Sequence, residues 1–100
     1  MLIYHIVKTD EWKEKQGFDQ YETESLHREG FIHCSFKYQI EDVLRKYFAR
    51  EEKVIILHVN PHLLNAEVRV EPTAEGEFYP HVYGKINFSA VVMVEERNLF

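Results

Sequence analysis

Three residues able to do chemistry stand side by side in the segment EGFIHCSFKYQ, residues 29–39: His33, Cys34 and Ser35. A cysteine beside a histidine at a helix start can be a nucleophile, because both neighbours lower the pKa of a thiol. Alternate side chains of a strand point to opposite faces, however, so His33 should face away from Cys34. Cysteine is also among the residues most often buried. We therefore expect Cys34 to be packed in the core and Ser35 to cap the helix that follows.

A bound zinc ion is the second chemistry that residues of these types suggest. His33 and Cys34 point to opposite faces and should not hold one ion together. The other close pair, His58 and His62, is separated by Asn60-Pro61, which interrupts any helix between them. We therefore expect no metal site.

Three histidines, His5, His33 and His81, lie in strand-like runs flanked by apolar or aromatic residues. An imidazole buried in such a place must find a hydrogen-bond partner, so it is costly to keep without a role. Any one of them taken singly is most simply a core histidine with satisfied hydrogen bonds. A functional cluster requires all three rings to meet in space, which their spacing along the chain does not decide.

A polar pocket for a nucleotide is the third possibility. The backbone donors of a helix beginning after Ser35 could bind an anion. Tyr79, His81 and Tyr83 share one face of a strand and offer planar rings for stacking. Glu71 could hold a ribose hydroxyl or act as a general base. The alternative for the tyrosines is ordinary packing on a sheet.

The elements that must position these residues are several short strands and one well-defined helix. Apolar residues recur along one side of a helix from Phe36 to about Arg50. The run KVIILHV at 53–59 is apolar throughout, so both of its faces should be covered. Further strands are expected at 2–8, 31–34, 67–71 and, in one or two pieces, over 78–96, with helical turns at 9–17 and 25–29. This pattern predicts an α+β fold.

Composition limits the class of protein. One hundred residues suit one domain, 1–100, and the net charge of -5 with scattered cations predicts no long nucleic acid as a partner. The single cysteine cannot form an internal disulfide, and no apolar signal region opens the chain, which predicts a reducing cytoplasm. Apolar runs such as AVVMV are too short to cross a membrane. A small anionic ligand remains compatible, because a few local donors can hold it.

The segments IYHIV, EGFIHCS, VIILHVNPHLL, VRVE and FYPHVYGKIN occur in the order seen in a small bacterial family. Over nearly its whole length the chain resembles domain-of-unknown-function family 952, with GFIHCS and PHVYG as the most specific segments. That family is similar in fold to ADP-ribosyltransferases and RNA 2'-phosphotransferases. The resemblance implies a bent, split β-sheet with a cleft for NAD-like ligands.

The resemblance also implies roles for individual residues. His5 matches a first-strand histidine that touches the adenosine-side ribose, although no Gly-Thr or Gly-Ser follows it. His33 takes the place of an aromatic residue that stacks on nicotinamide. The catalytic glutamate position falls near FYPHVYG, where His81 stands and no acid is found, and Glu71 or Glu77 could substitute. Standard ADP-ribosyl transfer to a protein is therefore not expected.

The leading hypothesis is binding of a small nucleotide, NAD or ADP-ribose-like, with turnover by a transferase or hydrolase reaction as its extension. NAD would then be a ligand, and the sequence identifies no cofactor. Two alternatives stay open: a non-catalytic ligand-binding module, and a protein-interaction module that docks through exposed aromatic residues. The predicted catalytic residues are His33, His81 and Glu71, and the predicted ligand-binding residues are His5, Ser35, Gln39, Tyr79 and Tyr83.

Overall fold

The computed structural model describes residues 1–100 and is built around an antiparallel sheet of three strands, β1 (Ile3–Lys8), β4 (Lys53–Val59) and β8 (Val91–Asn98). β4 lies in the middle, paired with β1 on one side and β8 on the other. All but its first and sixth residues are buried, as the continuous apolar run predicted. This strand therefore forms the centre of the core.

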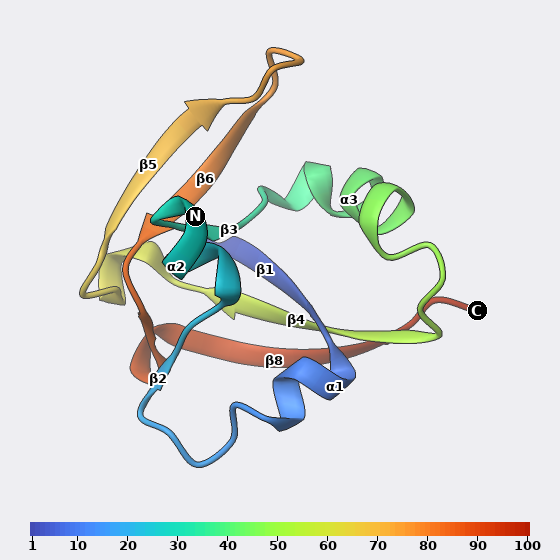
Figure 1. The fold of residues 1–100 in the computed structure, drawn as a ribbon, viewed down its shortest axis with the longest axis horizontal. Coiled ribbons are helices and arrows are strands. Elements are labelled where there is room, and N and C mark those ends of the chain that lie inside the picture. Colours follow the sequence, from blue (N-terminus) through green and yellow to red (C-terminus); the bar gives the residue numbers. More distant parts are fainter.

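A second sheet contains the strands that carry most of the predicted site residues. Its order is β3 (Ile32–His33), β6 (Phe78–Tyr83) and β5 (Glu67–Pro72), all antiparallel. A bridge between Tyr4 and Ser35 joins this sheet to β1. The β5–β6 hairpin projects away from the central sheet, on the same side of β1 as α3 (Figure 1).

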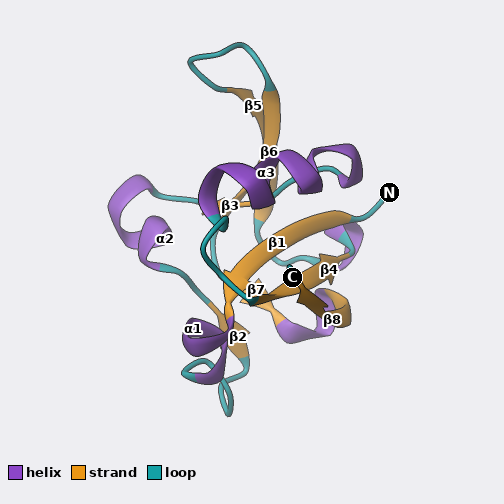
Figure 2. Cartoon of the chain, turned by 90° about the vertical axis from the view of Figure 1, so that its right-hand side faces the viewer, coloured by secondary structure: helices purple, strands orange, loops and turns teal.

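The remaining elements are short. Two strands of two residues each, β2 (Gln20–Tyr21) and β7 (Ile86–Asn87), pair with each other. The α-helices are α1 (Thr9–Lys13), α2 (Glu24–Glu29) and α3 (Ile40–Tyr47). The 3-10 turns are η1 (Lys37–Gln39), η2 (Pro61–Leu63) and η3 (Phe88–Ala90). Figure 2 shows the helices distributed around the strands rather than forming a layer of their own. The predicted α+β class is confirmed. None of the helices is long and apolar enough to cross a membrane.

Two apolar clusters lie on opposite faces of the central sheet, because neighbouring residues of a strand alternate in direction. Ile3 and Val7 of β1 belong to the larger cluster, which extends to the second sheet through Ile32 and Val82. Tyr4 and Ile6 belong to the smaller cluster, against which α3 packs. The buried side chains of α3, Ile40 and Leu44, contribute about 1.5–3 kcal/mol each by leaving water. Their burial fixes this helix over β1.

The start of α3 differs from the prediction. Ser35 does not cap the helix, because its backbone N–H and carbonyl both bond to Tyr4 and hold it in the bridge to β1. Phe36 takes the cap position instead, and its N–H donates to the side-chain Oε1 of Gln39 at 2.9 Å. A 3-10 turn follows, and the α-helix covers 40–47 rather than 36–50. The tertiary bridge thus decides where the helix begins.

Candidate functional site

A cavity of about 560 Å³ lies between β1, β3, α3 and the β5–β6 hairpin. Its size falls within the range of small-molecule sites, about 300–1,000 Å³. Aromatic and apolar side chains predominate in its wall. The lining residues are His5, Ile6, Phe31, His33, Cys34, Ser35, Val43, Tyr47, Phe48, Pro72, Thr73, Tyr79 and His81.

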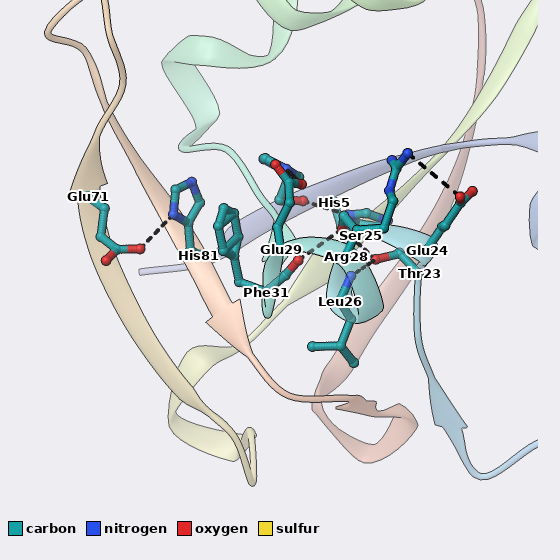
Figure 3. Close-up of polar contacts among 11 residues, drawn as sticks. His5, Thr23, Glu24, Ser25, Leu26, Arg28, Glu29, Phe31, Glu71 and His81 are labelled. Atoms are coloured by element: carbon teal, nitrogen blue, oxygen red, sulfur yellow. Dashed lines mark hydrogen bonds and ion pairs between the residues drawn. The ribbon is translucent and has the colours of Figure 1, made fainter.

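His81 is held at the wall of the cavity by Glu71. The antiparallel register of β5 and β6 puts Glu71, His81 and Tyr83 on one face of the hairpin. The carboxylate Oε1 of Glu71 lies 2.8 Å from Nδ1 of His81 (Figure 3), and the hydroxyl of Tyr83 donates to the same oxygen at 2.6 Å. The bond from Tyr83, followed by that from His81, lowers the pKa of Glu71. An ionised carboxylate only accepts, so Nδ1 carries the hydrogen, and Nε2 has no protein partner.

His33 lies next to His81, as the pairing of β3 with β6 requires. The two ring centroids are 5.5 Å apart in an edge-to-face arrangement. Nε2 of His33 lies 2.8 Å from a carboxylate oxygen of Glu29, and its side chain is 56% exposed. Phe31 stacks on His81 with a centroid distance of 4.0 Å and an interplanar angle of 10°, which fixes the plane of that imidazole. The structure therefore puts these two rings in contact, and His5 lines the same cavity.

His5 is the third histidine, and both of its ring nitrogens are occupied inside the protein. Nδ1 lies 2.7 Å from the carbonyl oxygen of His33, and Nε2 lies 2.8 Å from the hydroxyl of Tyr21. A carbonyl only accepts, so Nδ1 carries the hydrogen and Nε2 accepts from Tyr21. Burial, the largest cause, lowers the pKa of His5 to about 4. His5 thus ties β1 to β3 as a neutral ring, and its predicted contact with a ligand stays a prediction.

Cys34, Ser35 and Gln39 lie near the start of α3. The Cys34 side chain is buried, and burial raises its pKa to about 12, so it is present as a thiol. Ser35 lines the cavity beside it. The buried amide of Gln39 donates to the carbonyl of Phe78 at 2.7 Å and accepts from Phe36, so it pins α3 to β6. The predicted ligand contact of Gln39 stays a prediction, and its amide already has two protein partners.

The two predicted tyrosines differ in position. Tyr79 lines the cavity, and its hydroxyl donates to Glu77 at 2.7 Å. Burial, followed by that hydrogen bond, raises the pKa of Tyr79 to about 12. Tyr83 is not part of the lining, and its ring lies 4.2 Å below the guanidinium of Arg69. Tyr83 holds Glu71 through its hydroxyl, while its predicted stacking on a ligand stays a prediction.

Several residues of the site were missed by sequence reasoning. Phe31 lies directly before β3, and strand alternation puts it on the face of His33, but it was not among the predicted site residues. Tyr47 and Phe48 were recognised only as part of an apolar helix face, and Thr73 only as part of a loop. Nothing in their spacing indicates that α3 and the hairpin close around one cavity.

The site has the groups that acid–base chemistry requires. A carboxylate that holds one nitrogen of an imidazole leaves the other free to take or give a proton. Nowhere do three His, Cys, Asp or Glu side chains lie together in a set that could ligate a metal ion.

The family profile described as "Protein of unknown function (DUF952)" matches residues 6–94. No curated protein matches the chain. Protein CC0527 from Caulobacter crescentus is 26% identical in sequence to this chain, and its crystal structure superposes with a TM-score of 0.88. The match covers 100% of this chain and 89% of that one. A double mutant of CC0527 gives 25% identity and a TM-score of 0.87, with the same coverage. The solution NMR structure of CC0527 gives 26% identity and a TM-score of 0.84, and the match covers 99% of this chain and 86% of that one. The names of these structural genomics targets state no ligand or activity.

Proposed function

The chain belongs to the DUF952 family of proteins of unknown function, and we propose that its cavity binds a small organic molecule and exchanges a proton with it through His81. The observation that carries this proposal is the pair formed by Glu71 and His81. Glu71 fixes the tautomer of the ring, so that the neutral imidazole presents Nε2 as an acceptor at the cavity wall. A base oriented in this way is suited to proton abstraction.

The neighbouring residues suit supporting roles in this proposal. Tyr83 shares the carboxylate oxygen and holds Glu71 in place. Phe31 prevents the imidazole of His81 from turning, because the two rings are stacked. His33 lies close enough to act as the second proton-transfer group, with Glu29 as its partner. One imidazole would take a proton from the ligand, and the other would give one to the leaving group.

A nucleotide such as NAD, ADP-ribose or a 2'-phosphorylated nucleotide is the first ligand class to test. The fold similarity to ADP-ribosyltransferases and RNA 2'-phosphotransferases that the family resemblance implies favours this choice, and a transferase or hydrolase reaction would follow from it. The cavity volume admits a base or a nicotinamide ring, with Tyr79 as a planar face. A long nucleic acid is a poorer candidate, because the net charge is -5.

A binding module without catalysis is the second candidate. No Asp or Glu is among the lining residues, so a carboxylate reaches the ligand only through an imidazole or a hydroxyl. A site of this kind can bind a ring and leave it unchanged. Product formation separates the two candidates.

Thermal unfolding in the presence of each nucleotide tests the proposal. A ligand at about 100 times its Kd adds about 2.7 kcal/mol to the free energy of unfolding, which raises the Tm of a small domain by roughly 10 °C or more. We expect this increase in the wild type and its loss in His81→Ala. His62→Ala is the matched control, because His62 is exposed in η2 and does not line the cavity.

A ligand that raises the Tm is then incubated with the protein and analysed for product by chromatography. Product that depends on His81 supports an enzyme, and an unchanged ligand supports a binding module. Unaltered Tm values for every nucleotide, or equal increases in the wild type and His81→Ala, would contradict binding of nucleotides at this site.

A further inference from the structure

We propose that the natural ligand of this cavity carries a positive charge and is an organic ammonium or a cationic heteroaromatic ring. This inference rests on the proposed ligand-binding role of the cavity and names the chemical class that it selects. Three features carry it: the absence of cationic residues from the wall, the carboxylates behind the wall, and the aromatic rings that form it.

The first feature is the composition of the wall. Its residues are aliphatic, aromatic, hydroxyl, thiol and imidazole groups, and none is a Lys or an Arg. Proteins bind phosphate chiefly with Arg, Lys and helix N-termini. The backbone N–H of Ser35 is already bonded to Tyr4, and that of Phe36 to Gln39, so neither is free for an anion. Little in this wall could compensate the charge of a buried phosphate.

The second feature is a set of three carboxylates, each one side chain behind the wall. Glu71 accepts from His81, Glu77 accepts from Tyr79, and Glu29 is bonded to His33. The three residues bonded to these carboxylates, His81, Tyr79 and His33, line the cavity themselves. None of the three carboxylates forms an ion pair with a Lys or an Arg. The hydrogen bonds from Tyr83 and His81 lower the pKa of Glu71, so that its negative charge persists.

The positive group whose charge acts on Glu71 is Arg69, and it is already engaged. Its guanidinium lies over the ring of Tyr83 and hydrogen-bonds to Glu67 at 3.1 Å. Arg69 pairs with Glu67, and neither Glu77 nor Glu29 has a Lys or Arg partner. Each wall residue would then stand between a positive ligand in the cavity and the carboxylate to which that residue is bonded.

The third feature is the aromatic wall itself. Phe31, Tyr47, Phe48 and Tyr79 line the cavity, and the negative face of an aromatic ring attracts a cation. The hydroxyl of Tyr79 donates to Glu77, which polarises the phenol and makes its ring face more negative. Rings that surround a cation also replace part of its hydration without requiring a direct ion pair. Carboxylates at one remove then add attraction at longer range.

Pairs of ligands with the same shape and different charge test this inference. Choline is compared with 3,3-dimethyl-1-butanol, and 1-methylnicotinamide with 3-methylbenzamide, by isothermal titration or NMR shift changes. We expect each cation to bind about tenfold tighter than its neutral isostere, which corresponds to a cation–π and charge contribution of the usual size. The advantage should decrease as salt is added.

Glu77→Gln tests the origin of the selectivity. The amide oxygen still accepts from Tyr79 while the charge is lost, so the affinity for the cation should fall about threefold, with that for the neutral isostere unchanged. Glu75→Gln removes the same charge from the exposed tip of the same hairpin and should change neither affinity by as much.

Each remaining outcome overturns a defined part of the account. Equal affinities within both ligand pairs would refute cation selectivity and leave the cavity as a binding site. Nucleotides that bind more tightly with every added phosphate would also refute the inference while supporting the proposed function. Failure of all four probes and of every nucleotide to bind would refute both.

Discussion

Acidification below neutral pH should destabilise the protein through His5. The ordinary pKa of histidine is 6.5, and burial lowers that of His5 to about 4. Below pH 6.5 the unfolded chain binds a proton at this residue that the folded protein does not bind, so stability falls with pH. At pH 5 the unfolded ring is almost fully protonated and the folded ring is not, which corresponds to about 2 kcal/mol at 1.36 kcal/mol per pH unit. The loss should level off below pH 4.

Urea unfolding at pH 7.5 and pH 5 measures this effect, provided that the contribution of His5 is isolated. His5→Asn keeps an N–H that can donate to the carbonyl of His33 and has no titrating group. The pH-dependent loss of stability should be about 2 kcal/mol larger in the wild type than in this variant. His62→Asn is the control, because His62 is exposed, and it should retain the loss seen in the wild type.

The lowered pKa values of Glu67, Glu71 and Glu95 act in a different pH window. Their stabilising contributions are complete above the unfolded value of 4.5 and are lost as pH falls through their folded values. They therefore add little between pH 7.5 and pH 5. An equal loss of stability in the wild type and in His5→Asn would refute the claim that His5 is buried as a neutral ring.

Three further perturbations test separate parts of the structure. Gln39→Leu should lower the free energy of unfolding by about 2 kcal/mol in urea titrations, because two backbone groups lose their partner; a loss below about 0.5 kcal/mol would show that water replaces the amide. Tyr83→Phe should raise the pKa of Glu71 in a carbon-13 NMR titration, since its largest stabilising hydrogen bond is removed; an unchanged titration would contradict that bond. Cys34 should react with a thiol reagent at pH 8 far more slowly in the native protein than in urea, because burial raises its pKa; equal rates would place the thiol at the surface.

The central strand, the main helix and the packed cysteine could be predicted from the sequence because their signals are local. KVIILHV has the composition of a strand covered on both faces, and β4 is buried accordingly. The same alternation that sends His33 and Cys34 to opposite faces leaves the first exposed and the second buried. The fold class followed from the order of such elements.

The details of the site could not be predicted, because they depend on partners far away in the chain. His5 is bonded to residues 16 and 28 positions away, which decides that its nitrogens are occupied. Serine is a residue type that often caps helices, but the bridge of Ser35 to Tyr4 overrides that preference. The pairing of β3 with β6, which brings His33 to His81, is likewise set by tertiary structure.

Nitrogen-15 NMR of the histidine rings tests the central claim most directly. Spectra at pH 8, assigned with His81→Gln, should show His81 with its hydrogen on Nδ1, and addition of 1-methylnicotinamide should shift its Nε2 signal while His62 stays unchanged. A hydrogen on Nε2 of His81, or an Nε2 signal that does not respond to that ligand or to any nucleotide, would contradict a proton-transfer site at this cavity.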